Sequence, residues 1–226
     1  MVGKTYARGG WVALASVLAV LAADRPASAQ VTARLDTAVA VFDEVTTMSD
    51  KSIPDDLLRK AQCVAIVPGL KKGAFVVGAK FGKGFVTCRQ GAGWSAPAGI
   101  LIEGGSVGFQ IGGSETDVVL AIMNKRGVDR LLSSKFTLGA DASVAAGPVG
   151  RAASAQTDAR MTAEILSWSR SRGVFAGIAI DGATLRGDDE ANRDLYGRKL
   201  SVREIVTGRL DIPVAAKPLI DRLARY

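Results

Sequence analysis

The spacing of apolar residues divides the chain into helical ends and a strand-rich middle. Between residues 31 and 49, apolar side chains recur at every third or fourth position, which predicts an amphipathic helix. Ser52-Ile53-Pro54-Asp55 resembles a helix-capping box with proline in the first turn, and predicts a short helix that ends at Lys60. After Lys60 the pattern changes to short apolar runs separated by glycine and proline, which is typical of strands.

These short runs predict a sheet in the middle of the chain. The first strands are expected at 62–67, 74–80 and 84–89, with turns at Pro68-Gly69 and Phe81–Gly84. Further strands are predicted at 98–102, 106–112, 116–123, 136–146, 163–170 and 173–180, and short helices at 126–133, 188–196, 201–207 and near the C-terminus. This order predicts one domain of the α+β class, with a mainly antiparallel twisted sheet or partial barrel and short flanking helices.

The N-terminus has the pattern of a secretory signal. Two basic residues precede an apolar run from Trp11 to Ala23, and Ala27-Ser28-Ala29 follows as a small-residue cleavage site. The run is shorter than the about 20 residues of a membrane span. We expect residues 1–29 to be a signal peptide, residues 30–226 to form the domain, and the cleaved protein to be periplasmic or secreted. An uncleaved N-terminal anchor is the alternative.

Positive charge is concentrated in one stretch that is expected to fold. The chain has a formal net charge of +7, yet no acidic residue lies between Leu57 and Ile102. The basic residues of that window are Arg59, Lys60, Lys71, Lys72, Lys80, Lys83 and Arg89. Because the window is also rich in glycine and apolar residues, it predicts a basic folded surface that attracts phospholipid headgroups, polyphosphates or nucleic acid. An ordinary solvated face is the alternative.

Five residues of the window are candidate lipid-binding residues, namely Lys71, Lys72, Lys80, Lys83 and Arg89. A strand over residues 74–79 would span about 20 Å, with Lys71-Lys72 at one end and Lys80 and Lys83 at the other. The two pairs could then not share one headgroup. We expect the Lys71-Lys72 end to make the contact, with flat binding by both ends as the alternative.

Cys63 and Cys88 are the only cysteines, and an exported protein can keep a disulfide. In a simple meander, the first and third strands lie about 9–10 Å apart. A disulfide requires Cα atoms within about 7 Å, so a bridge would need a twist, a bulge or another strand order. A disulfide and two buried thiols both stay open at this point.

The glycine-rich segment Gly104–Gly113 is the most unusual part of the chain. As one strand, it would place Val107, Phe109 and Ile111 on one face and glycines on the other. Close strand packing or a bend explains a face of glycines, and a ligand groove is the alternative.

Motifs for catalysis are incomplete. Gly104-Gly105-Ser106-Val107-Gly108 matches the G-x-S-x-G nucleophile elbow, but the chain has no histidine and cannot build a His-dependent triad. The phosphate-binding P-loop motif is missing from the sequence. The acidic group that starts at Asp188 lacks the spacing of an EF-hand and fits the solvated start of a helix. We expect a protein that is not an enzyme and that needs no metal or cofactor.

A series of motifs runs through residues 32–212 in a fixed order. They are Cys63–Pro68, Leu70–Gly78, Gly104–Gly113, Thr116–Leu120, Lys135–Ala142, Ser169–Gly177 and Tyr196-Gly197. The series resembles the SYLF domain, a lipid-binding family. The resemblance implies a compact α+β module that binds phospholipids, with phosphoinositides as the ligands of eukaryotic members, some of which also bundle actin. Lys71-Lys72 matches the family position, so anionic lipid binding is carried over. Phosphoinositide specificity and actin binding are not carried over, because the expected export separates the chain from cytosolic actin.

Two functional hypotheses follow from these patterns. The first is a protein of the cell envelope that binds an anionic phospholipid membrane surface through the basic face around residues 59–89. The second is a structural or protein-interaction module of the periplasm that docks an acidic partner. Nucleic acid is not an expected partner, because export keeps the chain away from it.

Overall fold

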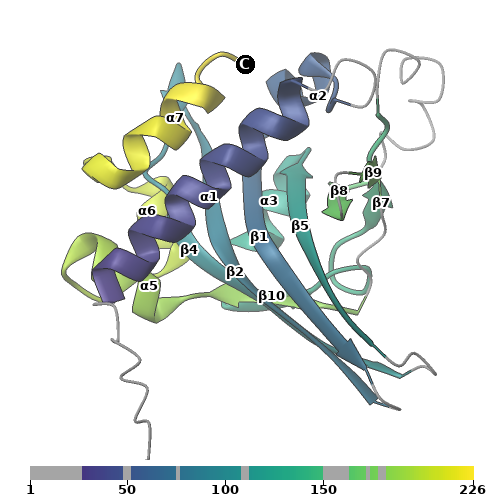
Figure 1. Ribbon diagram of the computed structural model, residues 1–226. Helices are drawn as coiled ribbons and strands as arrows, with labels where there is room; N and C mark the ends of the chain where they lie inside the picture. The colour runs from purple at the N-terminus through teal and green to yellow at the C-terminus, as the bar shows by residue number, and fades with distance from the viewer. Residues whose placement is uncertain are drawn as a thin grey trace, which may run out of the picture.

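A curled sheet with helices packed on it forms the domain (Figure 1). In this computed structural model, the described residues are 27–47, 52–74, 77–107, 112–149, 163–171, 174–177 and 182–226. The predicted α+β class is confirmed. Most of the expected signal peptide lies outside the described residues, and the expected cleavage point at Ala29 falls in the first turn of α1 (Ala27–Thr47).

The sheet is mixed but mainly antiparallel. Its strand order is β6-β10-β4-β2-β1-β5-β8-β7, with β3 beside β2 and β9 beside β8. Only β7 and β8 run parallel among the described pairs. The strands are β1 (Cys63–Ala74), β2 (Val77–Gln90), β3 (Gly93–Trp94), β4 (Ala98–Val107), β5 (Gly112–Ile122), β6 (Lys135–Thr137), β7 (Val144–Ala146), β8 (Ile165–Ser171), β9 (Val174–Gly177) and β10 (Thr184–Gly187).

Helices cover the two faces of this sheet. The described helices after α1 are α2 (Asp55–Lys60), α3 (Lys125–Leu131), α5 (Asp189–Tyr196), α6 (Val202–Thr207), the 3₁₀ turn η2 (Val214–Ala216) and α7 (Lys217–Leu223). Figure 1 shows α1 and α7 side by side across one face. The capping box predicted at Ser52 is wrong, since Pro54 is the N-cap of α2 and makes no side-chain cap bond. A capping box does occur at Ser201 and Glu204, where it starts α6.

Alternation along the strands builds two apolar cores. On the outer face, Val64, Ile66 and Phe85 pack under the buried stripe of α1 and under α7. On the inner face, within the curve of the sheet, Leu70 and Ile102 belong to a second core that includes residues of β6, β10 and α6. A residue's place on a strand therefore decides which of two different environments it enters.

The first hairpin differs from its prediction. β2 continues from Val77 to Gln90, so the turn predicted at Phe81–Gly84 is wrong, and the chain reverses between β1 and β2 instead. Pro68-Gly69 does not end β1 either: the pairing register of β1 shifts there, and Gly69 has a φ of 58°. One extra residue on one strand is the mark of a β-bulge.

The long hairpin places Cys63 directly opposite Cys88, and the two form a disulfide with an S–S distance of 2.04 Å. The three-strand meander that argued against the bridge is wrong, because the second and third predicted strands are one strand.

The single strand predicted over Gly104–Gly113 is also wrong. β4 lies beside β2 and β5 lies beside β1, so the chain reverses between them, and residues 108–111 lie outside the described residues.

The predicted strand over residues 136–146 is instead two short strands, β6 and β7, with a turn between them.

Candidate functional site on a four-stranded arm

Four neighbouring strands project together beyond the helices, at the lower right of Figure 1. We call this projection the arm, and define it as residues 71–74 of β1, 77–81 of β2, 103–107 of β4 and 112–115 of β5. Small residues stand opposite one another there: Gly73 pairs with Ala79 on one side and with Gly113 on the other. Because glycine and alanine have little or no side chain, few side-chain atoms cover the backbone around the longer side chains of the arm.

Lys72 and Lys80 are direct cross-strand partners. Opposed residues share one face of a sheet, with Cβ atoms about 4.5–5.5 Å apart. Lys72 lies two residues beyond the buried Leu70, so the lysine pair is on the inner face, at the open end of the inner core. The next residues across the sheet are Gly104 on β4, beside Lys80, and Ser114 on β5, beside Lys72, and neither is acidic.

The surroundings of the pair disfavour charge on Lys72. Partial burial lowers the pKa of Lys72, and the like charge of Lys80 lowers it further. Like charges directly opposed on a sheet destabilise it. A bound anion such as a phosphate would offset both effects, so the arrangement is suited to anion binding.

Lys71 lies on the opposite face of the arm, because neighbouring residues on a strand point to opposite sides. Its cross-strand partners are Phe81, which is 48% exposed, and the acidic Glu115. Lys71 and Lys72 therefore lie at the same end of β1, as expected, but on opposite faces. The expected separation of Lys72 from Lys80 by the length of a strand is wrong, because these two residues face each other.

Lys83 and Arg89 lie away from the arm and already have partners in the fold. The Nζ atom of Lys83 is 3.1 Å from Asp188 Oδ2 and 3.1 Å from Glu190 Oε2, an arrangement that ties β2 to the start of α5. This use explains a basic residue at this position without any ligand.

Arg89 joins the end of α2 to Tyr226, which follows α7. Its guanidinium donates hydrogen bonds to the carbonyls of Ala61 at 3.0 Å, of Leu58 at 3.1 Å and of Tyr226 at 3.3 Å. The guanidinium carbon lies 4.4 Å from the centre of the Trp94 ring. A cation at helix C-termini and over an aromatic face is stabilising, so Arg89 has a structural role.

Of the five predicted residues, the structure thus brings together Lys72 and Lys80, with Lys71 on the other face of the same arm. The exposed Phe81 was not predicted as part of this region, since that residue was expected to lie in a turn. Only the register of the hairpin reveals its place opposite Lys71.

Comparison with known proteins identifies the family. A family model described as "Ysc84: Las17-binding protein actin regulator" matches residues 103–226. SH3 domain-containing YSC84-like protein 1 of Xenopus laevis is 36% identical over 197 residues, which cover 84% of this chain and 58% of that protein. The chain belongs to the Ysc84 family. The resemblance to the SYLF domain is thereby confirmed.

Two yeast relatives support the same assignment of the chain to the Ysc84 family. Protein YSC84 of Saccharomyces cerevisiae is 36% identical over 177 residues, covering 76% of this chain and 37% of that protein. LAS seventeen-binding protein 3 of the same species is 36% identical over 176 residues, covering 76% of this chain and 38% of that protein. The chain spans 37% to 58% of the length of these relatives. Within the described residues, every helix is too short or too polar to cross a membrane.

Proposed function

We propose that this Ysc84-family domain binds the surface of anionic phospholipid membranes through the arm, and that Lys72 and Lys80 contact the headgroups. The supporting observation is the direct pairing of the two lysines on one face, with uncharged residues on either side of them in the row. A lysine near an anionic membrane contributes about 1 kcal/mol, screened by salt over a Debye length of about 10 Å. The pair alone gives weak, salt-sensitive binding, so other contacts of the arm add to it.

Flotation with phosphatidylglycerol or cardiolipin vesicles at low salt tests this proposal. Lys72→Glu with Lys80→Glu should abolish flotation, because it turns the inner face of the arm acidic. Lys71→Glu should have a smaller effect, since Lys71 lies beside Glu115 on the other face. Lys217→Glu with Arg203→Glu, at exposed positions of α7 and α6, gives the matched control for the change in charge of the double variant, and Lys217→Glu alone matches Lys71→Glu. Equal flotation with neutral vesicles, or no flotation of the wild type, would rule the proposal out.

The proposal includes export to the periplasm or the medium. The N-terminal pattern supports it, and so does the disulfide, because disulfides persist in oxidising compartments. Mass spectrometry of the protein recovered from the cell envelope should find a chain that begins at Gln30. A chain with residues 1–29 intact would favour an uncleaved anchor instead.

The family description favours a second candidate function, which is docking of a protein partner. Relatives are named for binding Las17, and the family model is described as an actin regulator. In this chain, the basic inner face of the arm would dock an acidic protein of the envelope. Pull-down from envelope extracts freed of lipid by detergent separates the two functions. A stoichiometric protein that is retained by the wild type and lost in the Lys72→Glu, Lys80→Glu variant would favour docking.

A further inference from the structure

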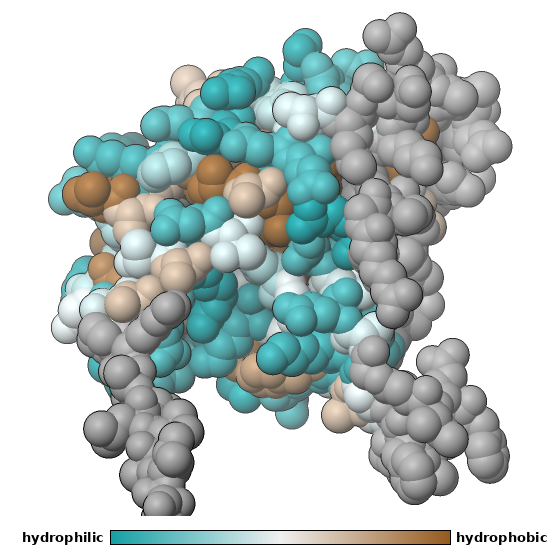
Figure 2. Space-filling model, viewed as in Figure 1, coloured by the Kyte–Doolittle hydropathy of each residue, from teal (hydrophilic) through white to brown (hydrophobic). Residues whose placement is uncertain are grey.

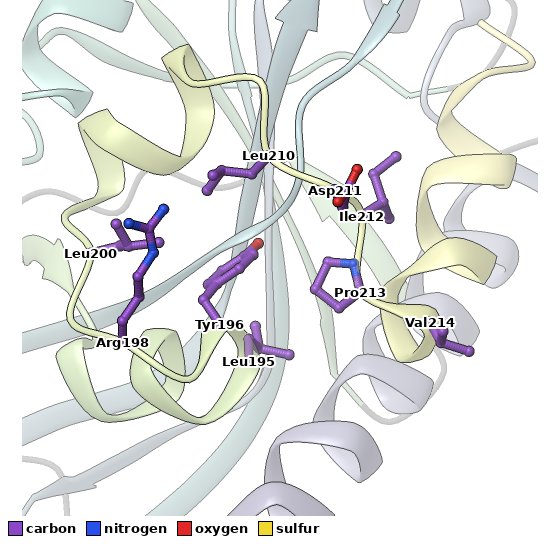
Figure 3. A pocket seen from close by; sticks show the side chains of 9 residues that line it. All are labelled: Leu195, Tyr196, Arg198, Leu200, Leu210, Asp211, Ile212, Pro213 and Val214. Carbon is purple, nitrogen blue, oxygen red and sulfur yellow. The ribbon is translucent and has the colours of Figure 1, made fainter.

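A second concave surface lies between the end of α5 and the segment that leads to η2 (Figure 3). It is an open groove with a volume of about 370 Å³, which lies within the range of small binding sites. Its apolar lining comes from Leu195, Tyr196, Leu200, Leu210, Ile212 and Pro213. Figure 2 shows apolar surface in the same part of the molecule, where η2 leads into α7 and along the seam between α7 and α1.

The floor of the groove is held in place by the fold. The hydroxyl of Tyr196 donates a hydrogen bond of 2.6 Å to the carbonyl of Pro97, in the segment before β4. Burial raises the pKa of Tyr196 far above its usual value, so the hydroxyl stays neutral and remains a donor. The left-handed Gly197 ends α5 directly after Tyr196 and turns the chain along the rim of the groove. The groove therefore exists before any partner arrives.

The rims of the groove carry opposite charges. Figure 3 shows Arg198 on one bank and Asp211 on the other. Both side chains are exposed, and neither lies within ion-pair or hydrogen-bond distance of another described side chain. Hydrogen bonds from Ser201 are the main cause of the lowered pKa of the Glu204 carboxyl, and Arg198 is near enough to add to that lowering. Lys199 lies 3.8 Å from Asp189. Val214 stands at the edge of the groove with 80% of its surface exposed, and the other exposed large apolar residue among those described is Phe81, at 48%.

We propose that this groove is the contact surface of a homodimer, in which a two-fold axis runs along the groove and each Arg198 pairs with Asp211 of the second copy. An isologous contact requires a surface that is complementary to itself. A two-fold axis along the groove places each bank against the opposite bank of the other copy, so each positive rim meets a negative rim. Val214, which follows Asp211 on the same bank, then lies against the Arg198 bank of the other copy.

The charge arrangement favours a second copy over other occupants. The headgroup of an anionic lipid or an acidic peptide would meet Asp211, and a basic peptide would meet Arg198, so each leaves one rim charge unfavourably placed. Only a partner that carries both charges at the same separation satisfies both rims, and another copy of this chain has them by construction. This inference does not depend on lipid binding, because the groove and the arm consist of different residues.

Sedimentation velocity of the purified protein over a range of concentrations tests the proposal. The wild type should be dimeric. Arg198→Asp alone and Asp211→Arg alone should each weaken dimerisation by about tenfold or more, because each turns two attractive contacts into two repulsive ones. Val214→Arg should do the same, because it places a second positive charge against the Arg198 bank of the other copy. Arg203→Asp, at an exposed position of α6 outside the groove, is the matched control and should leave the dimer intact.

A mixing experiment gives the sharpest outcome. When the two single variants are mixed, the heterodimer regains both pairs: Asp at position 198 of one chain meets Arg at position 211 of the other, and the native residues form the second pair. The mixture should therefore dimerise while each variant alone stays largely monomeric, and the double swap in one chain should also restore the dimer. A monomeric wild type, a mixture that does not recover, or a wild-type groove that takes up a lipid tail or peptide as a monomer would overturn the proposal. Circular dichroism of each variant confirms that it is folded.

Discussion

Removal of the Cys63–Cys88 disulfide should cost the domain much of its stability and leave the lysine pair in place. The bridge joins residues separated by 25 positions, at the base of the β1–β2 hairpin. Closing a loop of this length restricts the unfolded chain, which corresponds to about 3.5 kcal/mol at 25 °C in the chain-entropy model. Since a domain is typically stable by about 5–15 kcal/mol, the bridge supplies a large share.

Urea unfolding of the wild type and of the Cys63→Ala, Cys88→Ala variant measures this difference. Both cysteines are buried, at 0% and 6% exposure, so reductant should act on the wild type only as the domain opens. Reduced wild type and the variant should then unfold at similar urea concentrations. Reductant added to the variant is the control, and it should change nothing.

The same variant tests whether the arm is independent of the bridge. Cys63 and Cys88 pair at one end of the hairpin, whereas Lys72 and Lys80 pair toward the other. The folded variant should therefore float with anionic vesicles as the wild type does. A stability loss below about 1 kcal/mol would refute the loop-entropy reasoning. Loss of vesicle binding by the folded variant would show that the register of the arm depends on the bridge.

Three further outcomes are expected from the packing and charges of the fold. Arg89→Lys should lower the free energy of unfolding by about 1–3 kcal/mol in urea, because an ammonium cannot bond the carbonyls of Leu58, Ala61 and Tyr226 together. Gly84→Ala should cost about 3 kcal/mol or more, since its Cβ would lie 2.1 Å from the carbonyl oxygen of Ile66, whereas Gly93→Ala, with nothing within 4 Å, should stay within about 0.5 kcal/mol of the wild type. The pKa of Lys72 in the folded state is lowered from its usual 10.5, so the folded protein binds this proton less tightly than the unfolded chain does. The contribution of Lys72 to the free energy of unfolding should therefore rise with pH from the lowered pKa up to about 10.5. Lys72→Met should lack that rise when urea midpoints are compared at alkaline pH.

Elements with strong local signals were predictable from the sequence. The helix predicted at 188–196 is α5 (Asp189–Tyr196), and the one at 201–207 is α6 (Val202–Thr207). Both start at a capping side chain: Asp188 accepts a hydrogen bond from Ala191 N, and Ser201 from Glu204 N. Such bonds join residues three positions apart, so the information for them lies within one short stretch of sequence.

The hairpin was mispredicted because glycine occurs both in turns and within strands that approach a neighbour closely. Gly82 and Gly84 suggest a turn, yet both lie within β2. A Cβ on Gly82 would lie 2.8 Å from side-chain atoms of Leu70 and Val67, so the glycine is needed for close approach to β1. That contact joins residues far apart in the sequence. Without the partner strand, a glycine of this kind cannot be distinguished from a turn glycine, and the error separated Cys63 from Cys88 and Lys72 from Lys80.

The bulge at Pro68-Gly69 decides which lysine faces Lys80. In the register set by Ile66 and Phe85, Lys80 would stand opposite Lys71, but the extra residue shifts the register so that Lys80 stands opposite Lys72. The bulge is held from outside its own strand, because Asp117 Oδ1 accepts a hydrogen bond of 2.9 Å from Gly69 N while Asp117 Oδ2 accepts one of 2.8 Å from Arg170 Nε. The pattern of the β1 sequence contains neither partner. The composition of the basic window could therefore be predicted, while the face on which its charges meet depends on residues of β5 and β8.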